Sequence, residues 1–291
     1  MCIAVIVVNY SKRFPLIIAH NREEDVSRPT SPVAVRDGIL SALDLRAGGV
    51  AAVGLNVVTG TFVVLTNCRV KGSLHPDGQS RGALVRDVLM HGLSPSIRNE
   101  IHTTTFQGDF HLFTGSCFVT EEVRLEYLSN IPGVPVSDPV PTQAPDCTLQ
   151  VTVKMNEHPS SIEDWQPKID FLEDVLLEAL TENPNLESSD TVLNLVASFM
   201  SSTVPISSMQ MNSVYPWSPC PELEPTVLHN IIVPKTQLAD SVIFGTVSQT
   251  VIVVDGQSRA VAFHYRTVTQ EGLDVAFSPW DRHTVSYPVD S

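Results

Sequence analysis

Apolar residues near the start of the chain form short unbroken runs and do not alternate with polar residues. Residues 2–8 read CIAVIVV and residues 16–19 read LIIA, with a polar stretch at residues 9–13 between them. Both runs are rich in β-branched residues, which favour strands, and the polar stretch can form a turn, so a β-hairpin is predicted. Because the strands lack polar alternation, we expect them to be buried on both faces inside a layered domain.

The same reasoning predicts elements along the rest of the chain. We expect helices at residues 80–93, 161–182 and 190–201, with Ser80 and Asp190 as caps of the first and last. We expect strands at residues 50–55, 61–66, 112–120, 123–128, 241–245, 250–255 and 260–265. Two proline-rich stretches, residues 131–146 and 202–234, are loop-like, and the first is either a long loop or a domain linker.

The order of these elements predicts the fold class. Strands, one helix, strands, two helices and strands again do not match the βαβ alternation of a doubly wound sheet. The order fits an α+β fold, a four-layer αββα sandwich in which two mainly antiparallel sheets stack between helices. We expect a single domain over residues 1–291.

Charge and composition exclude several classes of function. The chain carries 32 acidic and 18 basic residues, a net charge of −14, so no nucleic-acid partner is expected. The five cysteines are widely spaced and include no CxxC pair, so no disulfide is expected. The nine histidines form no HExxH motif, so no metal site is expected.

The apolar runs also bear on the compartment. No run approaches the roughly 18 apolar residues of a membrane span, and the opening run has no charged flank or cleavage site typical of a signal peptide. We therefore expect a cytoplasmic protein without a membrane span. A mitochondrial address is the alternative, although the acidic residues Glu23, Glu24 and Asp25 disfavour a transit peptide.

Cys2 follows the initiator methionine directly. Removal of Met1 would give Cys2 a free α-amine, with an ordinary pKa of about 7.7–8.0 beside a thiol near 8.5. Such an amine can take the thiol proton near neutral pH, so nucleophile and base would come from one residue. The alternative interpretation is an inert buried thiol with Met1 retained.

A polar segment, HNREED, ends the second apolar run, and chain reversal brings it back beside Cys2. The Arg22 guanidinium there would favour a thiolate. The spacing of Asp25 from Arg22 would let its carboxylate hold the arginine, and Asn67 could donate an N–H to an oxyanion. The remaining candidates for ligand binding in this segment are His20, Asn21, Glu23 and Glu24. Alternatively, the segment is a loop of mutually satisfied charges.

Six sequence blocks occur in order over residues 1–90: MCIAVIVV, LIIAHNREE, SRPTSPV, DLRAGGVAAVGLN, TGTFVVLTNCR and SRGALVRDVL. Together they resemble the transport and Golgi organisation protein 2 family, named NRDE after a motif that here reads Asn-Arg-Glu-Glu. The stretch FGTVSQTVIVVDGQSRAVAFHYRTV is similar to the family's C-terminal meander. A motif tryptophan is lost in Gly49-Val50-Ala51, and a motif arginine is replaced by Val247.

The resemblance implies a fold like that of N-terminal-nucleophile hydrolases, related to penicillin V acylase and choloylglycine hydrolases. It implies that Cys2 is the nucleophile, Arg22 and Asp25 the arginine–aspartate pair, and Asn67 an oxyanion-hole neighbour. The motif matches add Arg69 and Arg81 as binding candidates. Family members are linked to Golgi organisation and secretion, and some are proposed to handle haem or to protect lipid metabolism.

Two functions with a small-molecule ligand remain open. One is a hydrolase that needs no cofactor and cleaves a small non-peptide amide through Cys2. The other is a non-catalytic trafficking or ligand-binding protein, in the cytoplasm or at the Golgi, that takes haem or lipid. Cys220 precedes Pro221 and could offer haem an axial thiolate, or it is an incidental thiol in a proline-rich loop.

Overall fold

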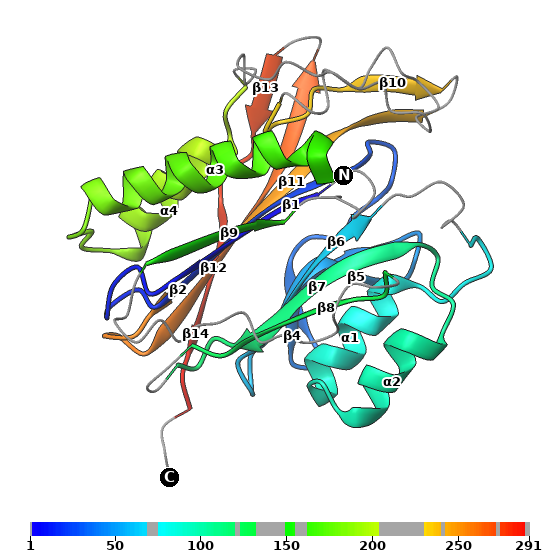
Figure 1. The fold of residues 1–291 in the computed structure, drawn as a ribbon, viewed down its shortest axis with the longest axis horizontal. Coiled ribbons are helices and arrows are strands. Elements are labelled where there is room, and N and C mark those ends of the chain that lie inside the picture. Colours follow the sequence, from blue (N-terminus) through cyan, green and yellow to red (C-terminus); the bar gives the residue numbers. More distant parts are fainter. Residues whose placement is uncertain are drawn as a thin grey trace.

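The computed structural model describes residues 2–68, 75–119, 123–131, 149–154, 162–203, 230–239, 242–271 and 274–288. Its strands form two antiparallel sheets that stack face to face, and a pair of helices covers the outside of each (Figure 1). The predicted α+β sandwich of four layers is confirmed.

The N-terminal hairpin lies inside the first sheet, whose order is β13-β12-β11-β2-β1-β9, with β10 paired to β11 and β14 to β12. Its strands are β1 (Ile3–Val8), β2 (Leu16–Asp25), β9 (Gln150–Lys154), β10 (Thr236–Ala239), β11 (Val242–Asp255), β12 (Ala260–Glu271), β13 (Asp274–Phe277) and β14 (Asp281–Ser286).

The second sheet follows chain order from β3 to β8. Its strands are β3 (Ala34–Arg36), β4 (Ile39–Asp44), β5 (Gly49–Asn56), β6 (Thr61–Cys68), β7 (Asp109–Ser116) and β8 (Leu125–Ser129). The described helices are α1 (Arg81–His91), α2 (Pro95–Thr103), α3 (Ile162–Glu182) and α4 (Ser189–Met200).

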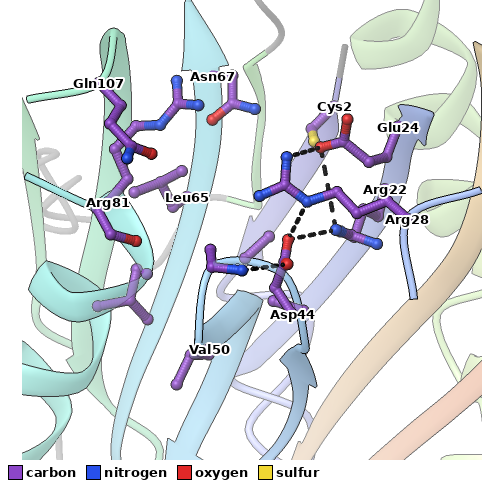
Figure 2. Close-up of a pocket in the computed structure, with 16 residues that line it drawn as sticks. Cys2, Arg22, Glu24, Arg28, Asp44, Val50, Leu65, Asn67, Arg81 and Gln107 are labelled. Carbon is purple, nitrogen blue, oxygen red and sulfur yellow. Dashed lines mark hydrogen bonds and ion pairs between the residues drawn. The ribbon is translucent and has the colours of Figure 1, made fainter. Parts of the chain in front are cut away.

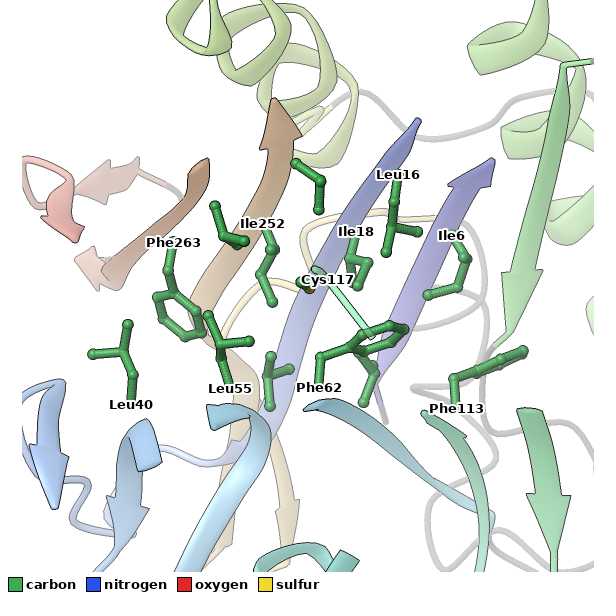
Figure 3. Close-up of a cluster of buried hydrophobic side chains, with 14 of the residues drawn as sticks. Ile6, Leu16, Ile18, Leu40, Leu55, Phe62, Phe113, Cys117, Ile252 and Phe263 are labelled. Carbon is green, nitrogen blue, oxygen red and sulfur yellow. The ribbon is translucent and has the colours of Figure 1, made fainter. Parts of the chain in front are cut away.

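Side chains of β1 alternate between two cores. Ile3 and Val5 pack in the core beneath α3 and α4, whereas Ala4 and Ile6 pack in the core between the sheets (Figure 3). A third core joins α1 and α2 to the outer face of the second sheet. Because successive residues of a strand point to opposite faces, a strand between two apolar layers is apolar at every position.

The second strand of the hairpin is longer than the sequence predicts. β2 continues through the polar segment to Asp25, so the predicted strand at residues 16–19 was too short. β2 lies between β1 and β11 and is hydrogen-bonded along both edges. The ladders on both sides satisfy its backbone, and its polar side chains find partners in the layers above and below.

The C-terminal strands show the same effect. The sequence predicts separate strands at residues 241–245 and 250–255, but β11 runs unbroken over both. The polar middle of β11 is buried, and its polar side chains have hydrogen-bond partners there. Gln249 Nε2 donates to Asn21 Oδ1 at 2.9 Å and to the Met200 carbonyl oxygen at 2.8 Å. A buried polar side chain is tolerated in a central strand when it is hydrogen-bonded in this way.

The predicted helices are present, with different caps. α4 is capped by Ser188, which forms a capping box with Thr191, so the prediction that Asp190 is the cap was wrong. Ser80 stands at the N-cap of α1, but its side chain makes no capping hydrogen bond. α2 and the strands β3, β4, β9, β10, β13 and β14 were not predicted.

Some predictions fall on residues outside the described part of the chain. These include Arg69, Cys220 and nearly all of both proline-rich stretches. Among the helices that are described, none combines the length and the apolar character that crossing a bilayer requires.

Candidate functional site

The register of the N-terminal hairpin brings Cys2 to Arg22. The ladder between β1 and β2 pairs Ile3 with Asn21 and Ala4 with His20, so Cys2 and Arg22, the next residues along, lie at the same end of the hairpin. Cys2 is 4% exposed, and both residues line one pocket (Figure 2).

Strand alternation divides the polar segment of β2 between two faces of the sheet. The side chains on the face toward the second sheet are His20, Arg22 and Glu24. On the opposite face, Asn21 Nδ2 donates to the carbonyl oxygens of Met200 at 2.9 Å and Ile231 at 3.1 Å. Glu23 is buried near Lys168 of α3. Asn21 and Glu23 therefore lie behind the sheet, away from the pocket.

Arg22 is held rigidly in a network of charges. It is 5% exposed, and Nη2 donates to Asp44 Oδ2 while Nη1 donates to Thr30 Oγ1, both at 3.0 Å. Arg28 Nε lies 2.6 Å from the same Asp44 oxygen. Glu24 completes the network, 3.9 Å from Arg22 and 3.6 Å from Arg28. Two guanidinium groups and two carboxylates thus balance each other beside Cys2 (Figure 2).

The prediction that Asp25 holds Arg22 was wrong, and Asp44 takes that role. Asp25 accepts hydrogen bonds from the Ser27 amide at 2.9 Å and the Ser27 hydroxyl at 2.7 Å, which lower the pKa of its carboxyl. It also lies 3.7 Å from Arg46. Residues three apart share a face on a helix but not on a strand, and this segment is a strand.

The pocket opens where two strands of the second sheet separate. β5 and β6 pair only at Val53–Val64, Gly54–Val63 and Leu55–Phe62 within these fully described strands, so their other ends diverge. A bulge accompanies the divergence: the register between β4 and β5 shifts there, and Ala52 has a φ of 70°. Left-handed backbone at a non-glycine residue is uncommon, and here it lies in the pocket wall.

The wall across from Cys2 carries hydrogen-bond donors. Asn67 extends from β6, Arg81 from the start of α1, and Gln107 from the segment before β7 (Figure 2). Arg81 Nη1 donates to the Asp109 carbonyl oxygen at 3.3 Å. The cavity volume is about 60 Å³, well below the roughly 300–1,000 Å³ of sites that enclose drug-sized ligands. It fits a small polar group.

Burial shifts the pKa values of three groups around the hairpin. Burial lowers the pKa of His20 to about 3, although Glu23 opposes the shift, so the imidazole is neutral. Burial also raises the pKa of Glu23 to about 7 and lowers the pKa of Lys168 to about 8. All three shifts favour the uncharged form, as expected for groups removed from water.

Sequence reasoning found part of this site. Of the predicted residues, Cys2, Arg22, Glu24, Asn67 and Arg81 line the pocket. His20 does not line it but forms a hydrogen bond with the Leu65 backbone. Among the charged and amide side chains that line the pocket, the prediction missed Arg28, Asp44 and Gln107. Arg28 could have been found from its position four residues after Glu24, whereas nothing in the sequence ties Asp44 or Gln107 to Cys2.

The described residues contain no group of three or more histidine, cysteine or acidic side chains placed to hold a metal ion. The fold and the site together define a class: an antiparallel αββα sandwich with a polar pocket at a cysteine that directly precedes the first strand. The chain belongs to the transport and Golgi organisation 2 family, whose model matches residues 1–270. A comparison with curated proteins finds no match.

Proposed function

We propose that the protein is a cysteine hydrolase that cleaves a small non-peptide amide, with Cys2 as the nucleophile after removal of Met1. The observation that carries the proposal is the pocket itself, in which the Cys2 side chain meets a buried arginine and a wall of donors. Membership of a family linked to transport and Golgi organisation is compatible with such an activity and does not require it.

The chemistry would use the free amine of Cys2 as the base. The amine takes the thiol proton, and the thiolate attacks the amide carbonyl carbon, which forms the C–S bond. The ammonium then returns the proton to the amide nitrogen as the C–N bond breaks and the amine product leaves. Water, deprotonated by the same α-amine, hydrolyses the thioester to a carboxylic acid and restores the thiol.

Two other residues would assist this step. Asn67 faces the cavity and can donate Nδ2–H to the oxyanion of the tetrahedral intermediate. Arg22 lines the same pocket as Cys2, and Asp44 keeps its guanidinium in place beside the thiol. Loss of one oxyanion donor lowers kcat by roughly 10²–10³-fold in a serine protease with an oxyanion hole.

The second candidate is a non-catalytic ligand-binding protein. Its supporting observation is that Arg22 is fully committed to ion pairs and hydrogen bonds. A cavity of about 60 Å³ does not enclose a haem, and Cys220 lies outside the described residues. Haem binding remains a proposal, tested by whether titration with haem produces a shifted Soret band that Cys220→Ser abolishes.

Intact mass and acyl transfer together test the hydrolase. We expect protein from its native source to lack Met1, and p-nitrophenyl acetate to give a stoichiometric burst of nitrophenolate with an acetyl group on Cys2. Cys2→Ser should abolish the thioester adduct. Cys117→Ser should leave the adduct unchanged, because the Cys117 thiol is fully buried. Retention of Met1, or acetylation of Cys2 no faster than in the unfolded chain, would overturn the proposal.

A further inference from the structure

The donors in the pocket are distributed unevenly between its walls. The described lining residues include the arginines Arg22, Arg28 and Arg81 but only two carboxylates, Glu24 and Asp44. Both carboxylates are in ion pairs with Arg22 and Arg28 beside Cys2. The opposite wall adds a guanidinium and two amides, so among the described lining residues cations outnumber anions by three to two, in a protein whose net charge is −14.

Arg81 is positioned by backbone packing. It is the first residue of α1, and the next residue, Gly82, packs on Gly49 so closely that a Cβ on Gly49 would lie 2.7 Å from the Gly82 carbonyl carbon. A hydrogen bond to the Asp109 carbonyl oxygen holds one end of the guanidinium. A donor fixed in this way loses little conformational entropy when a ligand binds.

Gln107 is held on the same wall by the chain around it. Its amide N donates to the Gln79 carbonyl oxygen at 3.0 Å, next to the isolated bridge between Gln79 and Phe106. Its side-chain amide lies near Arg81 and Asn67 in the pocket (Figure 2). The first turn of α1 contains no acidic residue, and its N-terminus carries a partial positive charge.

We propose that this wall binds a carboxylate, so that the substrate is a small amide that also carries a carboxylate group. Arg81 supplies the charge partner and Gln107 a second donor, while the amide carbonyl lies between Cys2 and Asn67. An arginine presents paired N–H donors that match the two oxygens of a carboxylate. This inference rests on the proposed nucleophile and adds the chemical class of its substrate.

Two alkylating reagents of nearly equal size test the inference. Iodoacetate and iodoacetamide both form a C–S bond at a thiolate and release iodide, but only iodoacetate carries a carboxylate. We expect the rate constant for iodoacetate divided by that for iodoacetamide to be about tenfold or more higher at Cys2 of the folded protein than in the urea-unfolded chain. A charge-assisted hydrogen bond usually has an effect of this size. Peptide mass mapping assigns each rate to Cys2.

Variants identify the residue responsible. Arg81→Gln should return the ratio to that of the unfolded chain, and Gln107→Ala should lower it by a smaller factor. The matched control is Arg86→Gln, because Arg86 lies on the same helix but pairs with Asp37 on the exposed face and should leave the ratio unchanged. Each variant is compared by the ratio of its two rate constants, so a general change in the reactivity of Cys2 cancels.

The outcomes separate this inference from the proposed function. The carboxylate subsite is wrong if the ratio of the two rate constants at Cys2 equals that of the unfolded chain. It is also wrong if Arg81→Gln leaves an elevated ratio unchanged. In both cases the proposed nucleophile can still be correct. If Cys2 reacts with neither reagent faster than the fully buried Cys117 does, the nucleophile itself is wrong.

Discussion

At the scale of single residues, His20 shows how the position of a side chain between two sheets controls its charge. Its imidazole is 2% exposed on the face of β2 that meets the second sheet. Burial lowers its pKa to about 3, so it stays neutral in the folded protein at pH values where the unfolded chain would protonate it.

This pKa predicts a loss of stability in acid. Between about pH 7.5 and pH 5 the unfolded His20 gains a proton and the folded one does not, which costs about 2 kcal/mol of folding free energy. Measured by urea unfolding, the free energy of unfolding of wild type should therefore fall by about 2 kcal/mol more between pH 7.5 and pH 5 than that of His20→Gln. Equal losses in the two proteins would contradict the assignment.

Glu23 acts in the opposite direction over the same range. Burial raises its pKa to about 7, so the folded state binds a proton that the unfolded state releases, and stability falls as the pH rises from about 4.5 to 7. Wild type and His20→Gln both contain Glu23, and its interaction with His20 is the smallest of the causes that shift its pKa, so most of its contribution cancels in the comparison between them.

At the scale of elements, the pocket depends on the contact between β5 and α1. Gly49 and Gly82 meet backbone to backbone, and a Cβ on Gly49 would lie 2.7 Å from the Gly82 carbonyl carbon. A Cβ on Gly82 would meet the Val50 carbonyl oxygen at 3.1 Å, a tight but less severe contact. Backbone cannot move aside as a flexible side chain can, so this contact sets the distance between the helix and the strand.

Alanine at these two glycines should therefore have graded effects. We expect Gly49→Ala to destabilise the protein by about 1–3 kcal/mol in urea unfolding, as overpacking does. Gly82→Ala should cost less, because alanine favours a helix over glycine by about 1 kcal/mol and offsets part of the strain. The reverse order, or no cost at either position, would show that the contact does not constrain α1.

The elements themselves were largely predictable because apolar runs mark buried strands. Short strands at the edge of a sheet, such as β3 and β13, carry little periodic signal and were missed. β2 and β11 extend beyond their apolar runs because their polar residues are paired across the sheet, as Asn21 is with Gln249. A local pattern does not contain those distant partners.

At the scale of the whole molecule, the pair between Arg22 and Asp44 joins the two sheets. Arg22 belongs to β2 in the first sheet and Asp44 ends β4 in the second. Both side chains are less than one tenth exposed. Asp44 also contacts Arg28, so its removal would leave two guanidinium groups without this carboxylate.

Asp44→Asn tests the importance of this connection. We expect a loss of about 3 kcal/mol or more in urea unfolding, the usual result when one partner of a buried ion pair is removed. The control is Asp37→Asn, which breaks the exposed pair with Arg86 at a left-handed position that asparagine tolerates, and it should stay within about 0.5 kcal/mol. Similar losses in both variants would contradict a special role for Asp44.

The sequence by itself determined the layered αββα architecture and the approach of Cys2 to Arg22. Both follow from local rules: unbroken apolar runs mark strands buried on two faces, and a hairpin brings its ends together. The tertiary structure alone decided that Asp44, and not Asp25, holds Arg22, and that Arg81 and Gln107 share a wall with Asn67. These contacts join segments that are far apart in the chain, and their geometry depends on the packing of whole sheets and helices.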